Sequence, residues 1–173
     1  PGQPGGALKL ANARATYGYL GPTRPDDNLL PGDFYFVHFD IEGLTTDETG
    51  NGKYNLSLTI NDAKGKLVHE LGPYEKPFVN SLGGTRTPAY ASVIIGTDSP
   101  PGDYTLKLTV SDPGTKKSES LERKYKVMPR TFGLVNLHIM DVRADPRGTP
   151  SGAAVRVVGD TIIYNCAVVG FDR

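Results

Sequence analysis

The chain of 173 residues has no tryptophan, a single cysteine and no excess of charge of either sign. One cysteine excludes an intramolecular disulfide framework. The 19 basic residues balance 19 acidic ones, so the sequence has no basic footprint for phosphate backbones, and nucleic acid is not an expected partner. No apolar run approaches the roughly 20 residues that cross a bilayer as a helix, so we expect no membrane insertion.

Glycine and proline are abundant, with 21 and 14 residues. They gather between apolar stretches in which apolar and polar residues alternate. Tyr54, Leu56 and Leu58, for example, alternate with polar residues, which is typical of a half-buried strand. Many short strands joined by turns predict an all-β antiparallel sandwich with almost no helix. The seven predicted strands cover residues 8–16, 33–42, 54–60, 67–71, 87–95, 104–111 and 118–127.

A family resemblance lies in the sixth of these strands. Pro100-Pro-Gly-Asp-Tyr104-Thr-Leu-Lys-Leu-Thr-Val-Ser-Asp112 resembles the Pro-x-Gly-x-Tyr-x-Leu-x-Val strand of bacterial immunoglobulin-like and fibronectin-III-like surface domains. The resemblance extends over residues 7–130 and implies a secreted, extracellular or cell-surface protein with a structural or adhesive role and no enzymatic activity. The chain departs from antibody domains because it lacks their tryptophan and cysteine pair.

The end of the sequence repeats its beginning at a separation of about 130 residues, which indicates a domain-sized repeat. Residues 8–15 align with 137–144, and the β run from Gly32-Asp33 to Gly43-Leu44 aligns with that from Gly159-Asp160 to Gly170-Phe171. We therefore predict a linker over residues 1–6, an immunoglobulin-like domain over 7–130, and the first two strands of a second repeat over 131–173.

Two strands cannot bury their own apolar faces, because a lone hairpin in water is marginally stable at best. Residues 131–173 therefore need a partner, which is further chain, the first domain or a neighbouring subunit. We favour strand pairing between subunits, giving a homo-oligomer or a polymer such as a surface layer or fibre. The residues expected to make this contact are Val155, Val157, Ile162, Tyr164, Val168 and Phe171.

The residues suited to catalysis are scattered. His38, His69 and His138 are expected at separate surface positions, and no nucleophile motif is present. Cys166 aligns with the inward-facing Phe39, so we expect a buried apolar filler there. The sequence predicts no catalytic residues and no bound cofactor.

Loop carboxylates offer a weak calcium site. Asp26, Asp27, Asp47 and Glu48 supply the oxygen ligands that Ca²⁺ prefers, but their spacing is irregular and turn formation is the favoured interpretation.

Three loop tyrosines support an alternative function. Tyr17, Tyr19 and Tyr74 could form a sugar-stacking surface, so the alternative to a structural module is an extracellular module that binds a glycan or another ligand.

Overall fold

The computed structural model describes residues 6–19, 21–80, 83–140 and 163–171. Over these residues the protein is all-β, without a helix, and its sheets do not close into a barrel, which gives a sandwich-like fold. The described residues also contain no helix that could span a membrane.

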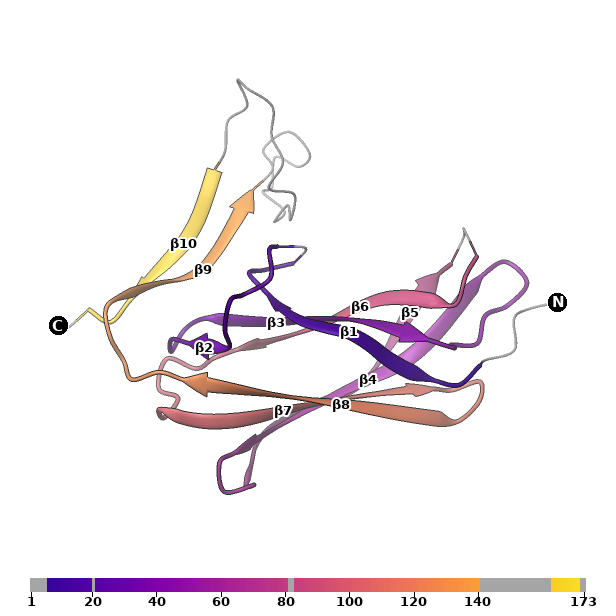
Figure 1. Cartoon of the computed structure of the whole chain (residues 1–173), viewed down its shortest axis with the longest axis horizontal. Helices are drawn as coiled ribbons and strands as arrows, with labels where there is room; N and C mark the ends of the chain where they lie inside the picture. The colour runs from indigo at the N-terminus through magenta and orange to yellow at the C-terminus, as the bar shows by residue number, and fades with distance from the viewer. Residues whose placement is uncertain (1–5, 20, 81–82, 141–162, 172–173) are drawn as a thin grey trace. The chain divides into compact units, whose positions relative to one another are not determined.

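In the described part of the chain, ten strands form three sheets (Figure 1). A three-stranded sheet has the order β1-β3-β6, a five-stranded sheet has the order β2-β8-β7-β4-β5, and β9 pairs with β10 alone. The strands are β1 (Lys9–Thr16), β2 (Asn28–Leu29), β3 (Phe34–Glu42), β4 (Asn51–Asp62), β5 (Leu67–Val79), β6 (Arg86–Ile94), β7 (Gly102–Asp112), β8 (Lys117–Val127), β9 (Gly133–Met140) and β10 (Ile163–Val169).

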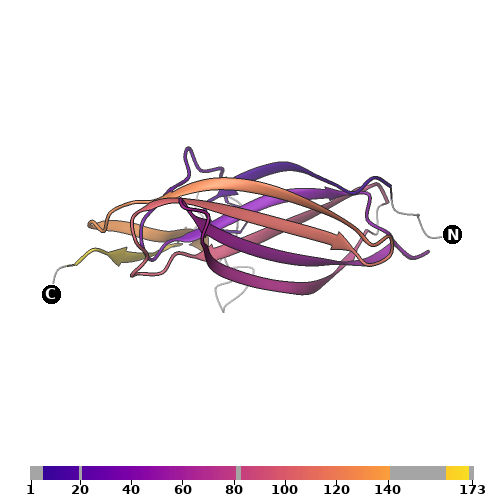
Figure 2. The ribbon, with the colours of Figure 1, turned by 90° about the horizontal axis from the view of Figure 1, so that it is seen from below.

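The alternation in the sequence sets the buried face of the five-stranded sheet. Leu56 pairs with Val110 and Leu58 with Leu108, so the apolar residues of β4 and β7 lie on one face. All four are buried, while Lys107, the residue before Leu108, is exposed. Figure 2 shows β7 and β8 running side by side in this sheet. The predicted all-β fold and the predicted inward positions of Leu56 and Leu58 are confirmed.

Strand β5 is longer than the sequence predicts. It was expected over residues 67–71 but runs to Val79 and includes Pro73 and Pro77. Proline lacks the amide that a central strand must donate, but an edge strand tolerates it, and β5 is the edge of its sheet. The prolines therefore did not end the strand, as they would in a central position.

Strand β2 was not predicted. It has two residues, Asn28 and Leu29, which pair in parallel with Lys126 and Val127. Leu29 is fully buried. So short a strand carries no alternation of its own, and its partner is distant in the sequence.

The expectation of a surface position for His38 is wrong. His38 is buried on β3, because the ring of Tyr90 stacks on it with 5.7 Å between the ring centroids. His69 is exposed on β5, as expected.

The chain divides into two compact units. Unit 1 has a core from both larger sheets, including Phe39, Leu58 and Leu108, and unit 2 buries Leu29 and Val135. The predicted boundary near residue 130 stays a prediction. Unit 1 contains Pro1–Ala13, His38–Ala91 and Asp103–Tyr125, and unit 2 contains Arg14–Val37, Ser92–Gly102 and Lys126–Arg173.

Two glycines that the predicted repeat aligns, Gly43 and Gly170, have the same backbone conformation. Gly43 follows β3 with φ 80° and Gly170 follows β10 with φ 81°. A Cβ at Gly43 would lie 2.4 Å from the carbonyl oxygen of Ala7, and one at Gly170 would lie 2.2 Å from that of Thr131. Both positions need glycine, because the left-handed conformation and the close backbone approach exclude a side chain.

A second pair of residues with the same backbone conformation aligns the first strand of each predicted repeat. Asn12 in β1 and Asn136 in β9 both have positive φ, 54° and 57°. Matching these two asparagines aligns β1 with β9, and Leu8 with Phe132. The predicted alignment of residues 8–15 with 137–144, which rests on residue types, differs from this one by five residues and lies partly outside the described residues.

A core substitution tests the assignment of faces. Leu108→Ala should lower the free energy of unfolding by about 2–5 kcal/mol, because Leu108 is fully buried and the change leaves a cavity. The neighbouring Lys107→Ala should change it by less than about 0.5 kcal/mol, because Lys107 is exposed. Chemical denaturation measures both, and equal effects would contradict the assignment.

Candidate functional site

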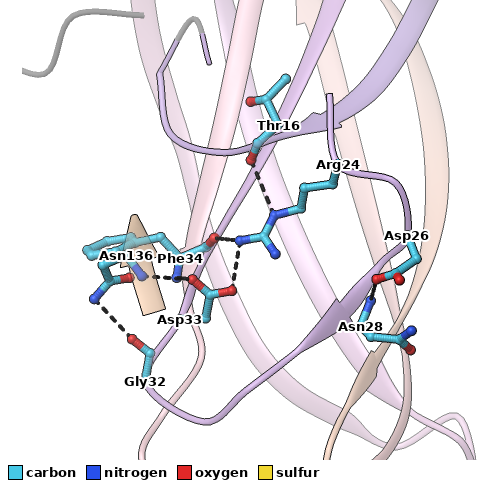
Figure 3. Close-up of polar contacts among 8 residues, drawn as sticks. All are labelled: Thr16, Arg24, Asp26, Asn28, Gly32, Asp33, Phe34 and Asn136. Carbon is cyan, nitrogen blue, oxygen red and sulfur yellow. Dashed lines mark hydrogen bonds and ion pairs between the residues drawn. The ribbon is translucent and has the colours of Figure 1, made fainter. Parts of the chain in front are cut away.

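A buried ion pair lies at the start of β3. The Nη2 atom of Arg24 donates to Asp33 Oδ2 at 2.7 Å, and the two side chains are 6% and 10% exposed. Arg24 also donates to the carbonyl oxygens of Phe34 at 3.0 Å and Thr16 at 3.4 Å (Figure 3). Its guanidinium carbon lies 4.4 Å from the centroid of the Tyr17 ring. Arg24 thus ties the loop after β1 to the start of β3.

The second oxygen of Asp33 binds the C-terminal hairpin, β9 and β10. Asp33 Oδ1 accepts from the amide of Phe34 at 2.9 Å and from the amide of Asn136 at 3.1 Å. The side-chain amide of Asn136 donates to the carbonyl of Gly32, also at 3.1 Å (Figure 3). These bonds fix β9 to the turn at residues 32–33.

Asn136 reaches this turn because it lies in a β-bulge. Asn165 pairs with His138 and Ala167 with Val135, so two residues of β9 lie opposite Cys166 alone. A bulge re-aims the residues within it, and positive φ suits asparagine better than most side chains.

One face of the hairpin packs on this turn. Val135 is 2% exposed, and a Cβ built on Gly32 would lie 3.1 Å from Cγ1 of Val169 and 3.9 Å from Cγ2 of Val135. Gly32 has φ 94°, so glycine serves both the turn and the close approach of the hairpin.

The opposite side of the hairpin is apolar and open to solvent. Leu134 pairs with Val168, and these side chains are 60% and 43% exposed. Cys166 is two residues from Val168 and Phe132 two residues from Leu134, so all four share a face. We call these four residues the exposed hairpin face. Phe171 adjoins it, since its ring centroid lies 5.7 Å from that of Phe132.

The predicted burial of Cys166 is wrong, because Cys166 is exposed. Its counterpart Phe39 is buried in a core to which both larger sheets contribute. No strand of the described residues other than β9 pairs with β10.

The structure describes only part of the predicted assembly set. Val168 and Phe171 are exposed, and Tyr164 lies in β10. Val155, Val157 and Ile162 lie outside the described residues.

An aromatic pocket lies beside the ion pair. Its volume is about 270 Å³, and the ring centroids of Phe34 and Phe36 in its wall are 6.0 Å apart. Tyr17 and Tyr19, both predicted as ligand-stacking residues, lie together here, whereas Tyr74 is exposed on β5 and does not line the pocket. The lining residues are Tyr17, Gly18, Tyr19, Arg24, Asp33, Phe34, Phe36, Asn136 and Leu137.

The loop carboxylates form turns. Asp47 Oδ1 accepts from the hydroxyl of Thr49 at 2.7 Å and from the amides of Thr49 and Asn51, each at 2.9 Å. The hydrogen bond from the Thr49 hydroxyl and that from the Asn51 amide lower the pKa of Asp47. Asp26 accepts similarly from the Asn28 amide at 3.0 Å (Figure 3).

Within the described part of the chain, no group of three or more histidine, cysteine or acidic residues could hold a metal ion. Calcium binding by Asp26, Asp27, Asp47 and Glu48 stays a prediction.

The ion pair can be tested against an exposed one. Asp33→Ala should lower the free energy of unfolding by about 3–5 kcal/mol, because it leaves the buried charge of Arg24 unpaired. Glu75→Ala removes the partner of Lys53 in a pair whose side chains are 56% and 57% exposed, and should cost less than about 1 kcal/mol. Guanidinium denaturation compares the two variants, and a small loss for Asp33→Ala would contradict the role of the pair.

Comparisons with known proteins give a likeness of fold only. No protein-family model and no curated protein matches the chain. Among solved structures, the chain is similar to a Pseudomonas fluorescens alkylpurine DNA glycosylase (13% identity, TM-score 0.44, 70% of this chain and 30% of that one). It is similar to a Clostridium perfringens family 123 glycoside hydrolase (10% identity, TM-score 0.44, 70% of this chain and 27% of that one). A CARDB domain from Pyrococcus furiosus is also similar (10% identity, TM-score 0.36, 70% of this chain and 89% of that one). The chain therefore spans less than a third of the first two proteins, and no likeness here reaches a level that informs function.

Proposed function

We propose that the protein is a non-enzymatic, extracellular structural module of immunoglobulin-like type that self-assembles through the hairpin β9–β10. The observation that carries the proposal is the exposure of apolar residues at positions whose counterparts in the N-terminal repeat are buried.

The correspondence of the repeats makes this contrast specific. Phe132 and Phe171 are 66% and 62% exposed. In the N-terminal repeat, every position that matches Phe132, Cys166, Val168 or Phe171 is buried. The matching residues are, in that order, Leu8, Phe39, Ile41 and Leu44.

Exposed side chains of this kind favour association. Burying apolar surface contributes a favourable free energy of roughly 25 cal/mol per Å². A two-stranded sheet has no second layer of its own that could bury its apolar face. Contact with another molecule at the hairpin would remove part of this apolar surface from water and stabilise the hairpin in the same step.

The non-enzymatic part of the proposal rests on the chemistry of the described residues. His38 in β3 packs against Tyr90 in β6, while His69 is exposed on edge strand β5. The Arg24–Asp33 pair is engaged in holding backbone and hairpin together. The extracellular setting rests on the family resemblance of residues 7–130.

A charge on the exposed hairpin face should prevent assembly. The full chain with Val168→Asp should be monomeric by multi-angle light scattering under conditions where the unchanged chain is oligomeric, because burying an unpaired carboxylate is costly. Ile94→Asp is the matched control, since Ile94 is also exposed and lies on edge strand β6. This control should leave the oligomer intact. An unchanged chain that is monomeric at every concentration would overturn the proposal.

A ligand-binding module is the second candidate, favoured by the gathering of Tyr17 and Tyr19 with Phe34 and Phe36 around one pocket. Stacking of a ligand ring on these side chains is the interaction that such a site would use. Glycan-array screening of the full chain, followed by titration of any bound glycan, tests it.

The tyrosines provide the variants for that test. Tyr19→Ala should weaken glycan binding about tenfold, because it removes one stacking surface. Tyr74→Ala should leave binding unchanged, because Tyr74 is exposed on β5 and does not line the pocket. Equal losses in the two variants would contradict a site in this pocket.

A further inference from the structure

We infer that β10 pairs edge to edge with β10 of a second molecule of the same chain, antiparallel and about a two-fold axis close to Cys166. The inference rests on the proposed self-assembly through the hairpin and specifies which surface makes the contact.

The other sheet edges carry features that oppose strand addition. A charged residue or a proline on an edge strand, or a very short edge strand, discourages pairing with another chain. Strand β1 contains Lys9 and Arg14, β6 contains Arg86 and Pro88, and β2 has two residues only. The remaining edge strand of the larger sheets, β5, contains Pro73, Pro77, Glu70, Glu75 and Lys76.

The hairpin lacks these features. Strands β9 and β10 contain no lysine, arginine, aspartate, glutamate or proline, although each is an edge of its two-stranded sheet. The sequence of β10, Ile-Tyr-Asn-Cys-Ala-Val-Val, is rich in β-branched residues and uncharged, as in segments that stack readily as strands.

Of the two hairpin edges, that of β10 is the better template. The bulge at Asn136 interrupts β9, and bulges twist an edge away from partners. Strand β9 also corresponds to β1, which is an edge in the N-terminal repeat, whereas β10 corresponds to β3. Strand β3 is central, with β1 on one side and β6 on the other, so the edge of β10 away from β9, which pairs with no other strand of the described residues, matches the edge of β3 that pairs with β6.

A second β10 fits this edge by symmetry. Pairing of identical strands about a two-fold axis is antiparallel, and full overlap of Ile163–Val169 places the middle residue, Cys166, opposite Cys166 of the second molecule. The result is a four-stranded sheet that joins the exposed hairpin faces of both molecules. Such a contact closes at two molecules, so the expected assembly is a dimer.

Cysteine cross-linking tests the geometry in the full chain. Cys166 is the only cysteine, so any disulfide joins two molecules. With copper–phenanthroline as the oxidant, two Cys166 thiols lose two protons and two electrons to form one S–S bond. We expect rapid formation of a covalent dimer that dithiothreitol reverses, because directly opposed residues bring their Cβ atoms within about 4.5–5.5 Å.

A displaced cysteine controls for random collision. Val68→Cys in a Cys166→Ala background places one exposed thiol on β5. It should cross-link at least tenfold more slowly than Cys166. Equal rates would overturn the inference.

Hydrogen exchange separates edge pairing from other modes of assembly. On raising the protein concentration, the β10 amides that point away from β9 should become at least tenfold more protected, while β9 amides on the opposite edge stay unchanged. If Val168→Asp abolishes assembly but β10 protection does not depend on concentration, the inference fails and the proposed function stands. If the unchanged chain never assembles, both fail.

A charged edge gives a further check that does not depend on oxidation. Cys166→Lys should yield a folded monomer, because the side chain is exposed in the single molecule but meets a like charge across the two-fold axis. Ile94→Lys, on edge strand β6, should remain a dimer. A dimeric Cys166→Lys variant would overturn the inference.

Discussion

The C-terminal part of the structure depends on the hydrogen bonds that the Asp33 carboxylate accepts. One of its oxygens holds Arg24 and the other accepts the amide of Asn136. A charge this deeply buried must remain paired, so the loop that carries Arg24 is fixed together with β3. The guanidinium of Arg24 also packs against Tyr17, which lines the aromatic pocket. The Asp33 carboxylate, by holding Arg24 and the Asn136 amide, therefore positions both the pocket wall and the hairpin.

Local patterns in the sequence were sufficient for most of the fold. The alternation around Leu58 and Leu108 fixed the buried face, because side chains of a strand point to opposite faces in turn. Contacts that depend on distant partners were not predictable. His38 is buried by Tyr90 from another strand, and β2 exists only through its pairing with β8. The match of Asn12 with Asn136 needed backbone angles, because a positive φ has no signature in apolar alternation.

The candidate site was predictable only in fragments. Tyr17 and Tyr19 are recognisable in the sequence as loop aromatics, but no pattern in the sequence indicates that the half-buried Phe34 and Phe36 of β3 line the same pocket. Arg24 and Asp33 gave no signal as a pair, because Pro and Gly residues lie between them and the partner Asn136 comes from the far end of the chain. Cys166 shows the opposite error. Its alignment with a core position was informative, yet its burial depends on strands that the described hairpin does not contain.

The bonds of Asn136 to residues 32 and 33 determine how the C-terminal hairpin can move. The chain passes from the end of β8 at Val127 to the start of β9 at Gly133 through five residues, a length that would ordinarily allow one element to swing about another. Here, rotation of β9 about that connection would break both bonds from Asn136 and expose Val135. The connection therefore acts as a fixed joint rather than a hinge, and the bonds of Asn136 hold β9 to the turn at residues 32–33 in one orientation.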